Sequence, residues 1–243
     1  MFFPRKSCIY TNIFNDWSQA ESFLKANRLF SEDFSSEIWM KTQLLFFQQS
    51  KRGLMPRFSS LPNFVNSKPN SRIIDFGGGS GWIGNFLPET CFYLNQETTS
   101  SLQYFKGINK TYNRIITKNA EAYVSSIDIL YSNSVIQYLP NVNIYIDLIR
   151  RFKPKYIVLD DVQLSNNMEF ITLQRRYGSY NISRFYNLNN LINSIIYYKY
   201  ELVSSELFPF VVSRKMKYKI ENRSHFDPNL TQPRSLVLKR LPE

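Results

Sequence analysis

The sequence predicts an α/β fold in which a mostly parallel β-sheet is covered by helices on both faces. From residue 71 onward, short apolar runs of strand length alternate with segments of helical period. The first of these runs passes directly into a turn with four glycines. Hydrophobic residues make up 43% of the 243 positions, enough to build the core of one domain. We therefore expect one α/β domain, residues 71–243, preceded by a smaller attachment, residues 1–70.

Residues 1–70 are predicted to form a helical attachment and a linker. Asp16 is placed to cap a helix, and Gln19 three positions later completes a capping-box pattern. The apolar residues that share one face of this helix are Trp17, Ala20, Phe23 and Leu24. A second helix is expected from Ser36 to about Gln49. Residues 50–70 are rich in Pro, Ser and Asn, so we expect a loop there.

The main domain is predicted to contain seven strands. They are Ile73–Phe76, Cys91–Leu94, Arg114–Thr117, Ile127–Tyr131, Tyr156–Leu159, Tyr198–Leu207 and Ser235–Leu241. Helices are expected after Gly81, around Leu102, from Tyr145 to Phe152 and from Leu188 to Ile196. Residues 162–183 show no clear period, and a loop of that length in a compact domain is usually a lid or an insertion.

The amino-acid composition limits the kinds of binding partner, metal site and location that are expected. The net charge of +11 favours an anionic partner, but the basic residues are scattered, so we expect a solvated basic surface more than a nucleic-acid face. Cys8, Cys91 and His225 do not have zinc-site spacing, and no metal is expected. No run approaches the roughly 18 apolar residues of a membrane span, and Pro4 interrupts the apolar start. The simplest location is the cytoplasm.

The glycine-rich turn is the main functional signal. It reads Asp75-Phe76-Gly77-Gly78-Gly79-Ser80-Gly81 and follows the first strand of the domain. A phosphate-binding P-loop requires Lys and then Ser or Thr after its last glycine, where this chain has Trp82 and Ile83. A dinucleotide site requires glycine at the sixth position, where Trp82 stands, so NAD is only a weak alternative.

An acidic residue, an apolar residue and then alternating glycines resemble the first motif of class I S-adenosylmethionine (SAM) dependent methyltransferases. The resemblance implies a Rossmann-like, mostly parallel, seven-stranded sheet with an antiparallel final strand. It also implies that Asp75 steadies the turn or the ammonium group of SAM. The turn residues Gly77, Gly78, Gly79, Ser80 and Gly81 would then pass close to the methionine part of SAM.

Three further residues are assigned to the cofactor. Glu97 ends the second strand, where a carboxylate can accept both ribose hydroxyl protons, and the resemblance implies that role. A glutamate favoured by a helix N-terminus is the alternative. Asn119, after the third strand, is where the family places an adenine contact, although a surface Asn in a turn explains it equally. Ser132, after the fourth strand, is also assigned to SAM.

A narrower resemblance covers nearly the whole chain. Trp17, the glycine turn, Ser132–Leu139 and Gln174 are similar to a group of predicted methyltransferases often encoded beside bacterial surface-polysaccharide genes. Asn133 and Asp161 depart from that group's pattern, which has a serine pair and a basic residue at these places. The resemblance implies a small-molecule or glycan acceptor in surface-polysaccharide assembly.

The acceptor is expected beyond the carboxyl ends of the fourth and fifth strands. Asp160 or Asp161 is predicted to act as general base or to bind the acceptor, with Gln137 and Tyr138 orienting it. The alternative is that the two carboxylates only cap the following turn. Gln174, Arg175 and Arg176 are predicted to cover the site and meet an anionic acceptor, unless they are simply exposed.

Two other functions remain open from the sequence. An RNA methyltransferase would account for the net charge of +11 and would bind RNA in a salt-sensitive way. A catalytically silent methyltransferase-like binding protein would hold SAM without transferring its methyl group.

Overall fold

The computed structural model describes residues 9–29, 36–55, 57–105, 114–166, 168–176, 179–208, 219–221 and 231–242. The helices are α1 (Trp17–Ala26), α2 (Glu37–Lys51), α3 (Leu61–Asn66), α4 (Thr99–Tyr104), α5 (Asn143–Phe152) and α6 (Leu188–Ile196). Three short 3-10 helices are η1 (Trp82–Phe86), η2 (Ala120–Ala122) and η3 (Ile136–Tyr138). No helix in these ranges is long and apolar enough to cross a membrane.

The strands along the first half of the chain are β1 (Ile9–Phe14), β2 (Arg72–Phe76), β3 (Phe92–Gln96), β4 (Arg114–Thr117) and β5 (Ile129–Asn133). The later strands are β6 (Tyr156–Ser165), β7 (Phe170–Arg176), β8 (Ser179–Asn187), β9 (Tyr200–Leu207), β10 (Lys219–Glu221) and β11 (Thr231–Arg240). All seven predicted strands are present, most of them with boundaries shifted by one to four residues.

The main sheet is Rossmann-like and mostly parallel, as the sequence predicts. Its strands follow the order β4-β3-β2-β5-β6-β11-β9. The pairs among β2 to β6 are parallel, whereas β11 runs antiparallel to both β6 and β9. The last strand therefore enters between two earlier ones, and the carboxyl ends of β2 to β6 meet at one edge.

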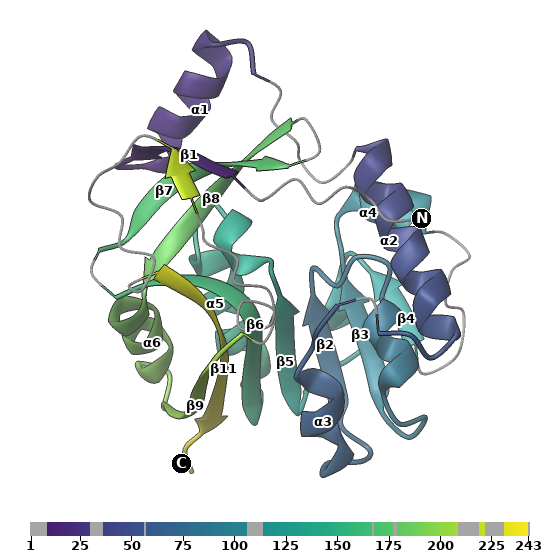
Figure 1. Cartoon of the computed structure of the whole chain (residues 1–243). Helices are drawn as coiled ribbons and strands as arrows, with labels where there is room; N and C mark the ends of the chain where they lie inside the picture. Colours follow the sequence, from purple (N-terminus) through teal and green to yellow (C-terminus); the bar gives the residue numbers. More distant parts are fainter. Residues whose placement is uncertain are drawn as a thin grey trace.

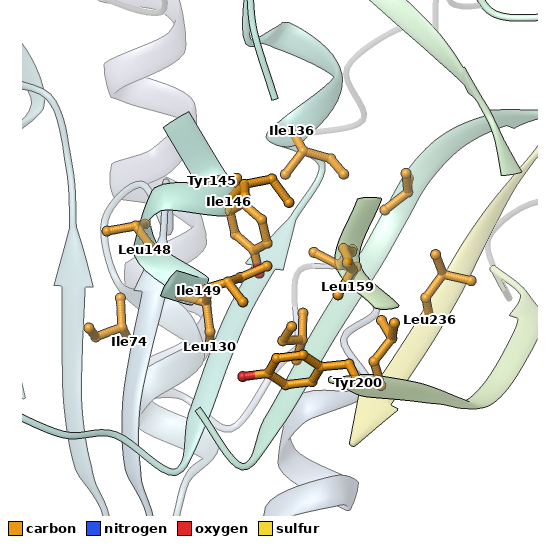
Figure 2. Close-up of a cluster of buried hydrophobic side chains, with 14 of the residues drawn as sticks. Ile74, Leu130, Ile136, Tyr145, Ile146, Leu148, Ile149, Leu159, Tyr200 and Leu236 are labelled. Atoms are coloured by element: carbon orange, nitrogen blue, oxygen red, sulfur yellow. The ribbon is translucent and has the colours of Figure 1, made fainter. Parts of the chain in front are cut away.

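Alternation along the strands gives each face of this sheet its own core. Ile74, Leu130 and Leu159 point to one face and pack under α5 and α6, together with Tyr145 and Tyr200 (Figure 2). Their sequence neighbours Ile73, Ile129 and Val158 point to the other face, where α2, α3 and η1 contribute apolar side chains. Because successive side chains of a strand point to opposite faces, both sets are buried. The prediction of helices on both faces is confirmed.

The predicted loop over residues 162–183 is wrong, because most of this stretch is β-structure. Strand β6 continues to Ser165, β7 and β8 form an antiparallel pair, and β8 joins β6 through the pairs Leu164–Tyr186 and Ser165–Asn187. β1 then pairs with β7, and β10 with β1. Four strands thus extend the sheet beyond β6, above its carboxyl edge in Figure 1.

The N-terminal segment contributes to both parts of the structure. Asp16 caps α1 by accepting a hydrogen bond from the Gln19 amide, as predicted. α1 lies over β7 and β8 (Figure 1). Leu24 of this helix packs in a cluster with Leu173. α2 begins after the N-cap Ser36 and packs against η1. The expected loop of residues 50–70 contains α3, whose second residue, Pro62, fits the first turn of a helix.

Candidate functional site

The glycine turn follows β2 directly and needs glycine for steric reasons. Gly77 and Gly79 have φ values of 74° and 61°, in the left-handed region that L side chains rarely adopt. A Cβ on Gly77 would also lie 2.7 Å from the methyl groups of Val135. The backbone of the turn therefore lies directly against the start of the segment after β5.

Asn95 holds the turn in place from the neighbouring strand β3. Its Oδ1 accepts a hydrogen bond from the Gly78 amide at 3.0 Å, and its Nδ2 donates to the Gly79 carbonyl at 2.8 Å. The side chain is fully buried. Asn95 was not among the residues predicted from the sequence, although an amide near the end of an otherwise apolar strand is a signal that could have indicated it.

Glu97 lies just beyond β3 and also binds the turn. Its Oε1 accepts a hydrogen bond from the Gly79 amide, and its Oε2 accepts one from the Thr98 amide at 3.0 Å. Burial raises the pKa of the Glu97 carboxyl, and hydrogen bonds from the two amides and from the Ser101 side chain oppose that shift. A carboxylate offers about four acceptor positions, so with these three donors about one remains for a ligand.

Asp75, near the end of β2, is the second carboxylate of the site. The Tyr93 hydroxyl donates to its Oδ2 at 2.5 Å, whereas its buried Oδ1 has no hydrogen-bond partner. Burial raises the pKa of Asp75 to about 7, the Tyr93 hydrogen bond opposes the shift, and the nearby Glu97 charge adds to it. The orphaned oxygen is available to a cationic or hydrogen-bond-donating ligand.

Helix α2 packs against the glycine turn through Gln43. The Ser80 hydroxyl donates to the Gln43 carbonyl at 2.8 Å, and the Ser80 amide donates to Gln43 Oε1 at 3.3 Å. One helical turn before Gln43, Trp39 lines the same site. Neither Gln43 nor Trp39 was selected from the sequence, because a helical stripe of apolar residues there reads as ordinary core packing.

A cavity of about 360 Å³ runs along the carboxyl edge of the sheet. Its wall includes Lys118 after β4, Gln96 to Thr98 at the end of β3, and Asp75 to Gly79 at the end of β2. It continues to Tyr131, Asn133 and Ser134 of β5 and its following turn, and then to Tyr138. The volume lies in the range of small-molecule sites. The cofactor residues predicted at β2 and β3 are therefore brought together.

Three predicted cofactor residues have other contacts. The Asn119 side chain accepts a hydrogen bond from the Glu121 amide and caps η2, outside the cavity wall. Ser132 donates to the Phe76 carbonyl at 3.2 Å and joins β5 to β2. Ser80 is buried against Gln43. These side chains shape the surroundings of the cavity without lining it.

Asp160, a predicted catalytic residue, lies in a buried network behind the cavity. Its carboxylate accepts hydrogen bonds from the Ser60 amide and hydroxyl, the Tyr131 hydroxyl and the Ser235 hydroxyl, at 2.7 to 2.9 Å. The side chain is fully buried and does not line the cavity. The structure therefore gives this carboxylate a role in joining α3, β5, β6 and β11.

Asp161 has a different environment from its neighbour. Its φ is 52°, a left-handed conformation inside strand β6, and its carboxylate contacts Ser134 and Arg57. The Asp161 carbonyl accepts a hydrogen bond from Gln137 Nε2 at 3.1 Å. Gln137 is buried and, like Asp161, lies behind the cavity wall. Arg57, which sequence reasoning missed in its proline-rich loop, does line the cavity.

Tyr138 connects the cavity to the added strands. Its hydroxyl donates to Gln174 Oε1 at 2.6 Å, and Gln174 Nε2 donates to the Tyr10 hydroxyl at 3.1 Å. Tyr138 lines the cavity, whereas Gln174 and Tyr10 are buried behind it. Two residues that were predicted separately to serve the acceptor, Tyr138 and Gln174, are thus brought together. The side chains of Arg175 and Arg176 lie outside the described residues.

No protein-family model matches the chain, and no curated protein matches it. Solved structures similar to it include an S-adenosylmethionine-dependent methyltransferase from Mesorhizobium loti, 13% identical, covering 74% of this chain and 97% of that one, with a TM-score of 0.49. Another from Clostridium acetobutylicum is 9% identical, covering 85% and 100%, with a TM-score of 0.49. The 1,6-didemethyltoxoflavin-N1-methyltransferase of Burkholderia thailandensis is 10% identical, covering 93% and 87%, with a TM-score of 0.46. At such low identities and TM-scores, function has to be argued from the site itself.

Proposed function

We propose that this protein is a SAM-dependent methyltransferase that acts on a small-molecule or glycan acceptor. The role in surface-polysaccharide assembly rests on the sequence resemblance of Ser132–Leu139 and the glycine turn. The cofactor and the reaction class rest on the chemistry of the turn, as follows.

The observation that carries the proposal is how the amides of the glycine turn are used. A phosphate-binding turn presents free amides to the ligand. Here the Gly78 amide donates to Asn95, and the Gly79 amide donates to Glu97. The cavity wall also carries two carboxylates, Asp75 and Glu97, which would repel a pyrophosphate. The turn therefore favours a cationic nucleoside over NAD or a nucleotide triphosphate.

The residues present fit SAM. The remaining acceptor capacity of Glu97 suits a ribose hydroxyl, and the orphaned Oδ1 of Asp75 suits the ammonium group. Gly78 leaves no room for a side chain, since a Cβ there would lie 2.3 Å from Asp75 Oδ2. When bound, SAM supplies an electrophilic methyl group on a positively charged sulfur.

The acceptor is then expected at the β5 end of the cavity. The wall there consists of Arg57, Tyr131, Asn133, Ser134 and Tyr138. Because Tyr138 donates its proton to Gln174, its oxygen can accept a hydrogen bond from an acceptor hydroxyl or amine. We assign Tyr138 the role of orienting the acceptor. Alignment of this kind supplies roughly 7 to 11 kcal/mol in well-oriented systems, so methyl transfer does not require a strong base.

The test is transfer of labelled methyl groups. The protein is incubated with methyl-labelled SAM and a bacterial extract separated into glycan, small-molecule, RNA and protein fractions. The proposal predicts label in the glycan or small-molecule fraction, and loss of that label in Glu97→Gln. Label in RNA would replace the proposed acceptor with the RNA alternative. SAM binding without label in any fraction would support the silent binding protein instead.

A further inference from the structure

The β5 end of the cavity contains a fixed guanidinium group, that of Arg57. Its interpretation as part of an acceptor site rests on the proposed function. Arg57 and Lys118 are the two basic side chains in the described cavity wall. Lys118 follows β4, whereas Arg57 bonds to residues after β5 and in β6. Since β3, β2 and β5 separate β4 from β6, the two cations lie at opposite ends of the site. Arg57 therefore belongs to the acceptor end.

The guanidinium of Arg57 is held by one of its nitrogens. Nη2 donates to Ser134 Oγ at 2.7 Å and to Asp161 Oδ2 at 3.0 Å. The side chains of Arg57 and Asp161 are only 25% and 16% exposed, so this ion pair is partly shielded from water. Asp161 adopts its left-handed backbone conformation at the place where it meets this group. The surroundings thus fix the orientation of Arg57 before any ligand enters.

Most of the donor capacity of Arg57 is left for a ligand. A guanidinium has five N–H donors, spread over Nε, Nη1 and Nη2. Among the described residues, Nε and Nη1 of Arg57 have no hydrogen-bond partner. An arginine that is fixed in a cavity with free donors suits an oxyanion, because its planar donor set matches carboxylate and phosphate geometry.

We propose that Arg57 binds a carboxylate or phosphate group of the acceptor, and that the acceptor is therefore anionic. Asp161 and Ser134 act as positioning residues, since both hold the guanidinium, Asp161 from behind the cavity wall and Ser134 from within it. An anionic acceptor also complements the positively charged sulfur that the proposed cofactor would bring to the reaction. Neutral acceptors of the same size leave the donors of Arg57 unpaired and are disfavoured.

Three probes with the same sugar ring test the proposal: glucose, glucuronate and glucose 1-phosphate. Binding is followed by the fluorescence of Trp39 and Trp82, which line the cavity, with and without saturating SAM. We expect at least one charged probe to bind about tenfold or more tightly than glucose, as for hydrogen bonds to charged groups. Glucuronate and glucose 1-phosphate then distinguish a carboxylate from a phosphate source.

Substitutions test whether Arg57 causes the preference for charged probes over glucose. Arg57→Gln is expected to reduce this preference to less than about threefold, and Arg57→Lys to keep part of it because the charge remains. Lys118→Gln, at the opposite end of the cavity, serves as the matched control and keeps it. The proposal is overturned if the wild-type protein binds the charged probes no better than glucose, or if the preference survives in a folded Arg57→Gln variant.

The two ideas can fail separately. Loss of the charged-probe preference in Arg57→Gln, in a protein that does not bind SAM, would uphold the anion site and reject the proposed cofactor. Normal SAM binding with equal affinity for all three probes would uphold the cofactor and reject the anion site. Should Arg57→Gln unfold, Arg57→Lys and the wild-type comparison still decide the matter.

Discussion

Tyr93 donates a hydrogen bond of 2.5 Å to Asp75 Oδ2, while Asp75 Oδ1 is buried without a partner. Burial raises the pKa of this carboxyl to about 7, so that it is only partly ionised near neutral pH. When it is charged, this buried carboxyl lowers the stability of the fold, but it can also bind a cationic ligand. Both the stability and the ligand binding can be measured.

Asp75 should make the protein less stable as the pH rises. Its pKa is raised in the folded state from 3.8 to about 7, so its contribution is full below pH 4 and is lost as the pH passes through 7. Between pH 5 and pH 8 we expect a loss of about 2 to 3 kcal/mol in the free energy of unfolding. Urea unfolding of the wild type and Asp75→Asn measures it. The variant should lack this loss, whereas a control at the exposed Glu201, Glu201→Gln, should retain it.

Glu97→Gln should weaken SAM binding without unfolding the protein. The amide keeps the shape of the side chain but removes the charge and one of the two acceptor oxygens that meet Gly79 and Thr98. We expect the dissociation constant of SAM to rise about 10- to 100-fold, the range for hydrogen bonds to a charged group. Calorimetry and thermal unfolding measure the two effects. Unchanged affinity in a folded variant would show that Glu97 only supports the turn.

Tyr138→Phe should slow methyl transfer while leaving SAM affinity within about twofold. The substitution removes the oxygen that orients the acceptor and leaves Gln174 without its Tyr138 donor. We expect kcat to fall at least about tenfold, because misplaced reactants lose alignment. Tyr123→Phe is a suitable control, since Tyr123 is 51% exposed. Equal rates for the wild type and Tyr138→Phe would remove this role.

Asp160→Ala should primarily destabilise the fold. The substitution leaves buried donors on Ser60, Tyr131 and Ser235 without their acceptor. We expect a loss of about 3 kcal/mol or more in the free energy of unfolding, as for a broken buried network. Denaturant unfolding checks this. A variant of normal stability that binds SAM but transfers no methyl group would instead support Asp160 as the general base.

The alternation of strands and helices and the cofactor end of the site could be predicted because each depends on a local pattern. Glycines after a short apolar strand predict a ligand turn, and a carboxylate at the next strand end predicts its neighbour. Glu97 and Gly79 do meet across β3 and β2. Parallel strands bring their carboxyl ends to one edge, so proximity follows from the fold class alone.

The acceptor end could not be predicted in the same way. β7 is buried on both faces, with Leu173 under α1 and Gln174 against Tyr10, so its period was obscured by polar residues. Arg57 comes from a proline-rich segment and reaches the site only through Ser134 and Asp161, far along the chain. Asp160 and Asp161 are adjacent in sequence, but their environments differ. Asp160 lies in a buried hydrogen-bonded network and Asp161 contacts Arg57, and only the tertiary structure reveals this difference.

The glycine turn is expected to select a cationic nucleoside over a phosphate-bearing one, and calorimetry can compare the two classes of ligand. The wild-type protein is titrated in a calorimeter with SAM, NAD and ATP under identical conditions. We expect saturable one-to-one binding of SAM and at least about 100-fold weaker binding of NAD and ATP, since Asn95 and Glu97 occupy the turn amides. Binding of NAD or ATP as tight as that of SAM, or no binding of SAM, would contradict it.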